Sequence, residues 1–207
     1  MAVGLGVGAN AAFADLDKKT PSYSIIATGD YYITPFLTAG LEFQNGLVTG
    51  GDRFTDPHLR YFKNNYTSIT ANGKISIGQV VNVDLYPKWY FIRNLYMGTG
   101  IGVIMNNQKE IVRNKPRPDG TIYTFPGKDK SMGLLLPAEI GMNFDLKTDY
   151  WGYTRFVVSA KYQFNVTFGE GLDGYNDPPT IFKNVSPDML GVGSIGIKYT
   201  FGPEGLW

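Results

Sequence analysis

The feature that most constrains this 207-residue chain is an alternation of side-chain character with a period of two, repeated in eight separate segments. In the first segment Val3, Leu5 and Val7 share one parity, while Gly4 and Gly6 lie between them. Successive side chains of a β-strand point to opposite faces, so the pattern predicts a strand with one apolar face and one face of very small residues. The alternation predicts eight such strands, over about residues 2–13, 22–34, 36–47, 64–80, 94–106, 133–146, 154–168 and 190–201.

Composition excludes several classes of protein. Lys and Arg total 19 and Asp and Glu total 18, so charge gives no reason to expect a nucleic acid partner. Cysteine is absent and His58 is the single histidine, which removes disulfides, thiolate metal sites and most histidine-based catalytic groups. We expect no cofactor and no metal, and a single domain over residues 1–207.

The second face of the strands separates two kinds of barrel. Strands with one apolar face suit a soluble barrel with an apolar interior or a membrane barrel with an apolar exterior. Here the other face consists mainly of Gly, Ser, Thr, Asn and Gln, whereas a soluble barrel carries many charges on its outside. Small side chains suit the narrow lumen of an eight-stranded barrel, and closure satisfies every backbone hydrogen bond in lipid. The predicted fold class is therefore all-β, an eight-stranded antiparallel up-and-down transmembrane β-barrel with a closed, polar lumen.

The last predicted strand resembles the closing strand of Gram-negative outer-membrane proteins. Ser194, Gly196, Tyr199 and Phe201 supply the polar residue, the glycine and the two aromatic residues of that signal for barrel closure and insertion. The run 30–42 is similar to the second hairpin of such barrels, particularly those of Bacteroidota. The whole chain resembles the small eight-stranded outer membrane beta-barrel family, related in plan to the OmpA transmembrane domain. The family signal usually ends the chain, whereas residues 202–207 follow it here.

The resemblance implies a compartment and a set of partners. It implies an integral protein of the bacterial outer membrane, with periplasmic termini and extracellular long loops. The implied partners are outer-membrane lipid and lipopolysaccharide, other outer-membrane proteins, and the barrel-assembly machinery during insertion. We interpret residues 1–14 as the first strand of a mature chain and not as a secretory signal, because they lack a positive n-region and a continuous apolar core.

A small set of charged residues interrupts the small-residue face. Isolated charges in a confined lumen carry a large desolvation cost, so charges of opposite sign are expected to pair there. This predicts a structural salt-bridge network, in preference to an ion path, with Asp30 and Asp145 reducing its positive excess. The predicted members are Glu42, Lys74, Glu139, Arg155, Lys161 and Lys198.

The predicted long loops, roughly 48–62, 107–132 and 169–188, contain the other candidate residues. The last of these loops carries four oxygen-bearing side chains, which we interpret as a polar contact loop, with a weak divalent-cation site as the alternative: Glu170, Asp173, Asn176 and Asp177. A G-x-G-x-x-G match at 191–196 lies inside a predicted strand and lacks the following helix of a dinucleotide site, so its glycines are interpreted as lumen-facing.

The functional prediction is a non-enzymatic structural or accessory subunit of a larger outer-membrane complex for secretion or nutrient uptake. Contacts are expected through the long extracellular loops and the lipid-facing strands. Two alternatives stay open. One is a lipid-modifying enzyme, in which His58 is oriented by Asp52 or Asp56 and activates Ser131 or Ser186. The other is a narrow pore.

Overall fold

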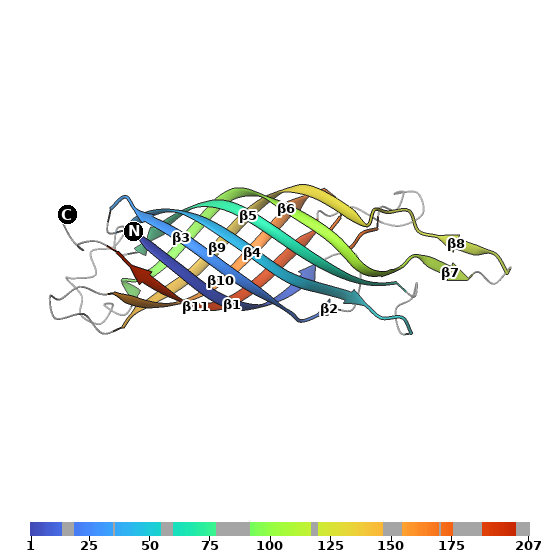
Figure 1. The fold of residues 1–207 in the computed structure, drawn as a ribbon, viewed down its shortest axis with the longest axis horizontal. Helices are drawn as coiled ribbons and strands as arrows, with labels where there is room; N and C mark the ends of the chain where they lie inside the picture. The colour runs from blue at the N-terminus through green and yellow to red at the C-terminus, as the bar shows by residue number, and fades with distance from the viewer. Residues whose placement is uncertain are drawn as a thin grey trace.

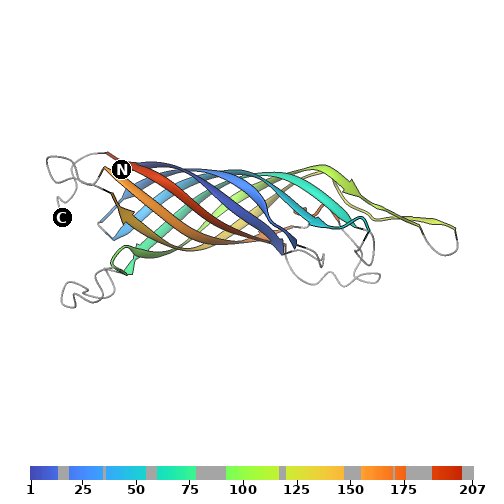
Figure 2. The same cartoon turned by 90° about the horizontal axis from the view of Figure 1, so that it is seen from below.

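Eight long antiparallel strands form a closed, tilted barrel, which Figures 1 and 2 show from two sides. The structure is a computed structural model and describes residues 1–13, 19–34, 36–54, 60–77, 92–116, 120–146, 155–169, 171–175 and 188–201. The barrel strands are β1 (Ala2–Phe13), β3 (Ser22–Tyr32), β4 (Leu37–Gly51), β5 (Tyr61–Ser76), β6 (Leu95–Val112), β9 (Lys130–Asp145), β10 (Phe156–Phe168) and β11 (Met189–Thr200). Three short strands lie beyond them: β2 (Lys19–Thr20) pairs with β4, while β7 (Asn114–Pro116) and β8 (Ile122–Thr124) form a separate hairpin.

Each barrel strand pairs with its neighbour in the chain, and β1 pairs with β11 to close the ring. The closing register runs from Ala2 opposite Thr200 to Phe13 opposite Met189. The predicted fold class, an eight-stranded antiparallel up-and-down barrel, is confirmed. Among the described residues, no helix is long and apolar enough to cross a membrane.

Several strand ends differ from the sequence prediction. The predicted loop 48–62 is partly strand, since β4 continues to Gly51 and pairs there with Tyr61 at the start of β5. The predicted loop 107–132 is also partly strand, because β6 continues to Val112 and β9 begins at Lys130. At the opposite end β5 stops at Ser76, before the predicted boundary. Most outward positions of the extensions are polar or small, as at Thr49, Lys63, Asn107 and Lys130, so the apolar alternation weakens before the strands end.

The apolar parity faces outward on all eight strands. Every barrel strand presents at least one large exposed apolar side chain: Leu5, Ile25, Leu41, Ile69, Ile101, Ile140, Tyr162 and Ile195. A continuous apolar belt of this kind is far larger than the patches that monomeric soluble proteins expose to water. It matches the lipid-facing band of a transmembrane barrel.

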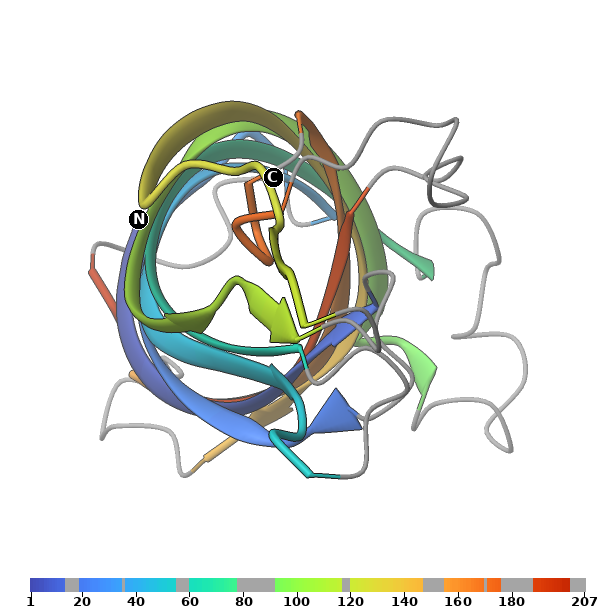
Figure 3. The same ribbon diagram turned by 90° about the vertical axis from the view of Figure 1, so that its right-hand side faces the viewer.

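The interior has two layers along the barrel axis. Charged and amide side chains occupy the part nearer the two termini. Toward the other end lies an apolar cluster of Ala12, Ile26, Val48, Phe62, Tyr66, Ile104, Phe125, Leu135, Leu172, Tyr175, Leu190 and Val192. Figure 3 looks into this end and shows the orange segment 171–175 inside the ring of strands.

Glycines on the inner face make room for the charged layer. A Cβ atom on Gly141 would lie 2.5 Å from Tyr96 Cζ and 2.8 Å from Lys161 Cβ. A Cβ atom on Gly98 would lie 3.0 Å from Glu139 Oε1. Real Cβ contacts are rarely this short, so the narrow barrel accommodates its large lumen side chains only beside residues without side chains.

Candidate functional site

Six buried charges form an unbranched chain of alternating sign across the lumen. The Nζ atom of Lys198 donates to Asp30 Oδ2 at 2.7 Å, and Lys74 Nζ donates to Asp30 Oδ1 at 2.8 Å. Lys74 Nζ also lies 3.8 Å from Glu139 Oε1. One aspartate therefore serves two ammonium groups, and one of these continues to a second carboxylate.

Lys161 completes the chain between two glutamates. Its Nζ lies 3.1 Å from Glu139 Oε2 and also contacts the carboxylate of Glu42. The order Lys198, Asp30, Lys74, Glu139, Lys161, Glu42 takes one residue from each of six strands: β11, β3, β5, β9, β10 and β4. Three positive and three negative groups give the chain no formal net charge, which limits the cost of burying it.

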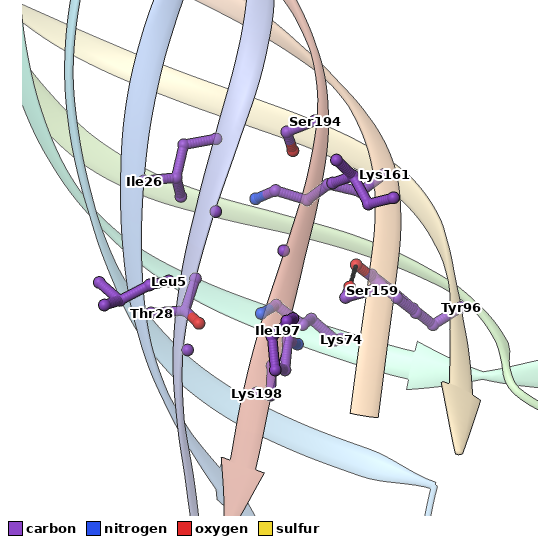
Figure 4. A pocket seen from close by; sticks show the side chains of 14 residues that line it. Leu5, Ile26, Thr28, Lys74, Tyr96, Ser159, Lys161, Ser194, Ile197 and Lys198 are labelled. Atoms are coloured by element: carbon purple, nitrogen blue, oxygen red, sulfur yellow. Dashed lines mark hydrogen bonds between the residues drawn. The ribbon is translucent and has the colours of Figure 1, made fainter. Parts of the chain in front are cut away.

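A small cavity lies beside the positive end of this chain. Figure 4 shows the nitrogen atoms of Lys74 and Lys198 close together at its centre, with Tyr96 and Ser159 to one side. The Tyr96 hydroxyl lies 3.4 Å from Ser159 Oγ, and the Tyr96 ring centroid lies 5.9 Å from Lys198 Nζ. The cavity beside these two lysines is thus lined in part by hydroxyl groups and an aromatic ring.

The sequence predicts five members of this chain directly and gives the sixth only a supporting part. The structure brings together Glu42, Lys74, Glu139, Lys161 and Lys198. Asp30, which was expected only to ease the positive excess, is the carboxylate shared by two lysines; its place on the polar parity of its strand was the available signal. Arg155 lies before β10 at the rim of the barrel and is only half-buried. Asp145 is exposed and accepts a hydrogen bond from Asn94 Nδ2 at 3.1 Å.

An amide layer joins the charges to the apolar cluster. Gln44 Nε2 donates to Glu42 Oε1 at 2.6 Å and to Gln163 Oε1 at 2.7 Å. The Tyr66 hydroxyl donates to Gln44 Oε1 at 3.3 Å and accepts from Asn10 Nδ2 at 3.3 Å. Side chains with both donors and acceptors can extend a hydrogen-bond network in a space too narrow for bulk water.

The segment 171–175, which we term the cap, covers the apolar cluster. Its Leu172 side chain is 1 % exposed and its Tyr175 side chain 3 %. The carbonyl oxygen of Leu172 accepts from Asn64 Nδ2 at 2.9 Å and from Gln108 Nε2 at 3.2 Å. The cap thus satisfies its backbone on the inner faces of β5 and β6 while burying two apolar side chains.

Tyr175 fixes the end of the cap. Its hydroxyl donates a hydrogen bond to Val112 O at 2.7 Å, and Tyr61 O is a second acceptor at 3.2 Å. These two residues form the last pair between β5 and β6. Burial raises the pKa of Tyr175, so the hydroxyl remains a donor over the physiological range. The Phe125 ring lies against it, with 5.8 Å between the two ring centroids, and Arg60 Cζ lies 5.6 Å from the Tyr175 ring centroid.

Of the four residues predicted as loop contacts, one lies in the cap and three lie outside the described residues. Asp173 lies in the cap, is buried, and accepts a hydrogen bond from Tyr175 N at 3.0 Å. It therefore stabilises a turn inside the barrel mouth. Glu170, Asn176 and Asp177 lie outside the described residues. Sequence reasoning missed the cap because Leu172 and Tyr175 are isolated apolar residues in a segment rich in glycine and oxygen-bearing side chains.

The residues of the catalytic alternative are only partly described. His58, Asp56 and Ser186 lie outside the described residues. Ser131 Oγ accepts from Asn106 Nδ2 at 3.1 Å and lies 3.4 Å from Gly171 O, beneath the cap. Asp52 Oδ1 accepts a hydrogen bond from Phe54 N at 2.9 Å. Among the described residues, no group of three or more His, Cys, Asp or Glu could hold a metal ion.

The residues of the closing-strand signal lie on both faces of β11, with Phe201 directly after its end. Ser194 and Gly196 stand opposite Gly8 and Gly6 across the closure. Tyr199 and Phe201 point outward, with ring centroids 4.8 Å apart in an edge arrangement. The match to a dinucleotide motif lies within this strand, but the prediction that its glycines face the lumen holds only for Gly196. Gly191 and Gly193 share the outward parity of Ile195 and Ile197 and lie beside the exposed Tyr162 side chain.

One side of the barrel is taller than the other. We term the parts of β4, β5 and β6 beyond the apolar belt the wall; its outward residues include Asn45, Asn65 and Asn107. The hairpin β7–β8 extends the wall further (Figure 1). Two large apolar side chains are exposed at its tips, Phe54 at 88 % and Ile122 at 68 %.

An apolar belt around a closed ring of strands, with paired charges inside, defines the class: a small eight-stranded integral β-barrel of the outer membrane. Solved structures of similar fold include Neisserial surface protein A, with 12 % identity, a TM-score of 0.48 and coverage of 97 % of this chain and 96 % of that one. Ail of Yersinia pestis has 14 % identity and a TM-score of 0.45 over 97 % of both chains. The N-terminal β-barrel domain of Pseudomonas aeruginosa OprF has 12 % identity and a TM-score of 0.43, over 96 % of this chain and 97 % of that one.

These likenesses concern the fold alone. No protein-family model and no curated protein sequence matches the chain. The narrower resemblance to barrels of Bacteroidota stays a prediction.

Proposed function

We propose that this protein is a non-conducting, non-catalytic scaffold of the outer membrane, an accessory subunit that presents its wall to a partner protein. The observation that carries the proposal is the difference in height between the wall and the rest of the barrel. Three strands continue their pairing beyond the apolar belt, to Gly51, Tyr61 and Val112. Ordering backbone beyond the membrane costs conformational entropy. Contacts with a partner on this surface would offset that cost.

The tips of the wall fit a protein partner. Phe54 and Ile122 are large apolar side chains in water, and interface energy concentrates in a few such anchors with polar surroundings. Arg53 precedes Phe54 in the chain; its Cζ lies 4.9 Å from the Tyr61 ring centroid and its Nη2 2.9 Å from Glu110 Oε2. We place this end outside the cell, with the termini in the periplasm.

A sealed interior supports the scaffold in preference to a pore. The charge chain, the amide layer and the cap fill successive levels of the lumen, and an eight-stranded barrel has space for side chains but not for an aqueous channel. For such an accessory subunit, we propose membership of a secretion or nutrient-uptake complex as the cellular role.

Site-specific photo-crosslinking tests the proposal. A photoreactive residue at Ile122 is expected to give one defined protein adduct in cells, identified by mass spectrometry. The same residue at Met97, an exposed belt position, serves as the matched lipid-facing control. Monomer alone at Ile122, together with recovery only as a free monomer in mild detergent, contradicts the accessory role.

A further inference from the structure

A group of exposed lysines lies where the outside of the wall leaves the apolar belt. On the outward face of β6 and β9, Met105 stands opposite Met132, and both side chains are exposed to the lipid side. The next outward pair along these strands is Asn107 opposite Lys130. The change from methionine to amide and lysine marks the edge of the hydrocarbon region.

A β-bulge brings a second lysine to this edge. The register between β5 and β6 shifts at Lys63 and Asn64, so that Lys109 is the extra residue. Lys109 and Glu110 are both exposed in succession, which breaks the alternation of the strand. Bulges at barrel rims commonly re-aim a side chain in this way.

The two lysines are close neighbours on one face. Lys130 stands opposite Asn107, and Lys109 lies two residues further along β6, so the pair is diagonal, about 7–8 Å apart between Cα atoms. No ion pair engages either lysine among the described residues. The two acids nearby are already paired: Glu110 with Arg53 at 2.9 Å and Lys63 at 4.0 Å, and Asp129, next to Lys130 in the chain, with Arg113 at 2.7 Å.

The height of the lysines matches a lipid headgroup layer. On strands tilted by about 40°, two residues rise about 5 Å and four residues about 10 Å. Lys130 therefore starts about 5 Å beyond Met132, and Lys109 about 10 Å beyond Met105. The polar layer of a leaflet extends about 5–8 Å beyond its hydrocarbon, so Lys130 lies within it. Lys109 starts just beyond this layer and reaches back into it through its long, flexible side chain.

We propose that Lys109 and Lys130, with Lys63 beside them, bind the phosphate groups of lipid A in the outer leaflet. Five cations (Arg53, Lys63, Lys109, Arg113 and Lys130) against two acids (Glu110 and Asp129) leave a local charge of +3. This charge complements a phosphorylated glycolipid whose acyl chains lie against the methionines below. The site lies on the outer flank of the wall, apart from the tips that contact the partner protein.

Retention of lipid A in nanodiscs tests the site. The whole chain is placed in zwitterionic phospholipid containing bis-phosphorylated lipid A, and the lipid A retained per barrel is measured by native mass spectrometry. The variant K109Q/K130Q is expected to retain it about fivefold less tightly for each lysine removed, and the difference shrinks at high salt. K115Q, on the β7–β8 hairpin and farther from the bilayer, is the matched control and keeps the retention of the parent.

Three outcomes overturn the site: no preference of the parent chain for lipid A over phosphatidylcholine, equal retention by K109Q/K130Q, or an equal loss in K115Q. Equal retention of phosphatidylglycerol overturns the assignment to lipid A. Loss of lipid A retention upon raising the salt concentration with the parent chain supports the site without any substitution. Photo-crosslinking at Ile122 is an independent measurement. A negative lipid A result therefore does not contradict the scaffold proposal, and a negative crosslinking result does not contradict the lipid A site.

Discussion

The two ends of one lumen are closed by different physical means. Near the termini a chain of charges spans the barrel, and every member depends on partners from other strands. Near the wall, a five-residue segment covers an apolar cluster with two buried side chains and a few backbone hydrogen bonds. Loss of one charge leaves its partner buried and unpaired, whereas loss of an apolar contact removes only its own burial and leaves a void. The charged end is therefore expected to be the more sensitive to single substitutions.

The largest effect is expected at the shared carboxylate. Asp30→Asn leaves Lys198 without a carboxylate and Lys74 with only Glu139 at 3.8 Å. Breaking a buried ion pair costs about 3–5 kcal/mol, so the free energy of unfolding should fall by about that amount. Urea unfolding in lipid vesicles measures it. Asp145→Asn removes an exposed carboxylate as a control, and D30N/K198M should recover most of the loss. An equal effect at both aspartates would erase the distinction between the buried chain and the surface.

The cap is expected to respond locally. Leu172→Ala removes a fully buried side chain and should lower the free energy of cap opening by about 2–3 kcal/mol. The effect on unfolding of the whole barrel should be much smaller, because a short segment opens by itself. Hydrogen exchange at the amides of Leu172 and Tyr175 measures the opening, with Ile122→Ala as the exposed control. A whole-barrel loss as large as that of Asp30→Asn would show that the two ends are one cooperative unit.

A smaller loss is expected where an inner glycine makes room for the charged layer. Gly141→Ala places a Cβ atom against Tyr96 and Lys161 and should destabilise the barrel by about 1–3 kcal/mol through overpacking. Gly73→Ala is the matched control, since its Cβ atom would meet nothing nearer than Thr99 O at 4.0 Å. Thermal unfolding followed by heat-modifiable mobility in gels compares them. A neutral Gly141→Ala would mean that the charged layer tolerates displacement.

A variant that opens the cap is expected to conduct no more ions than the parent chain. L172A/Y175A opens the mouth, but the charge chain and the amide layer still fill the lumen beneath it. Planar-bilayer recordings should therefore show no conductance steps for the parent or the variant. Steps in the variant alone would assign the seal to the cap and reopen the narrow-pore alternative.

The period-two alternation was enough to predict the barrel, because lipid on one side and a narrow lumen on the other impose opposite demands on alternate residues. The same alternation places the charged residues of the ion chain on the lumen side of their strands, as the pair of Glu42 and Lys161 illustrates. The wall was underestimated because its outward residues face water, where neither demand applies. The cap was missed because Tyr175 and Phe125 meet only after distant segments fold together, and nothing in the local sequence encodes that contact.

The span of the charge chain along the sequence has a consequence for how the barrel assembles. Asp30 and Lys198 are 168 positions apart, and Glu42 and Lys161 are 119 apart. Such pairs form only after nearly the whole chain has been placed, and contacts this remote slow the search for the native state. Until β11 docks on β1, Asp30 has one ammonium partner where the finished barrel gives it two. The ion chain is therefore complete only at the end of assembly. A half-built sheet can form the Lys74–Asp30 pair, but the Lys198–Asp30 pair forms only once the last strand is in register and then helps to hold the ring closed.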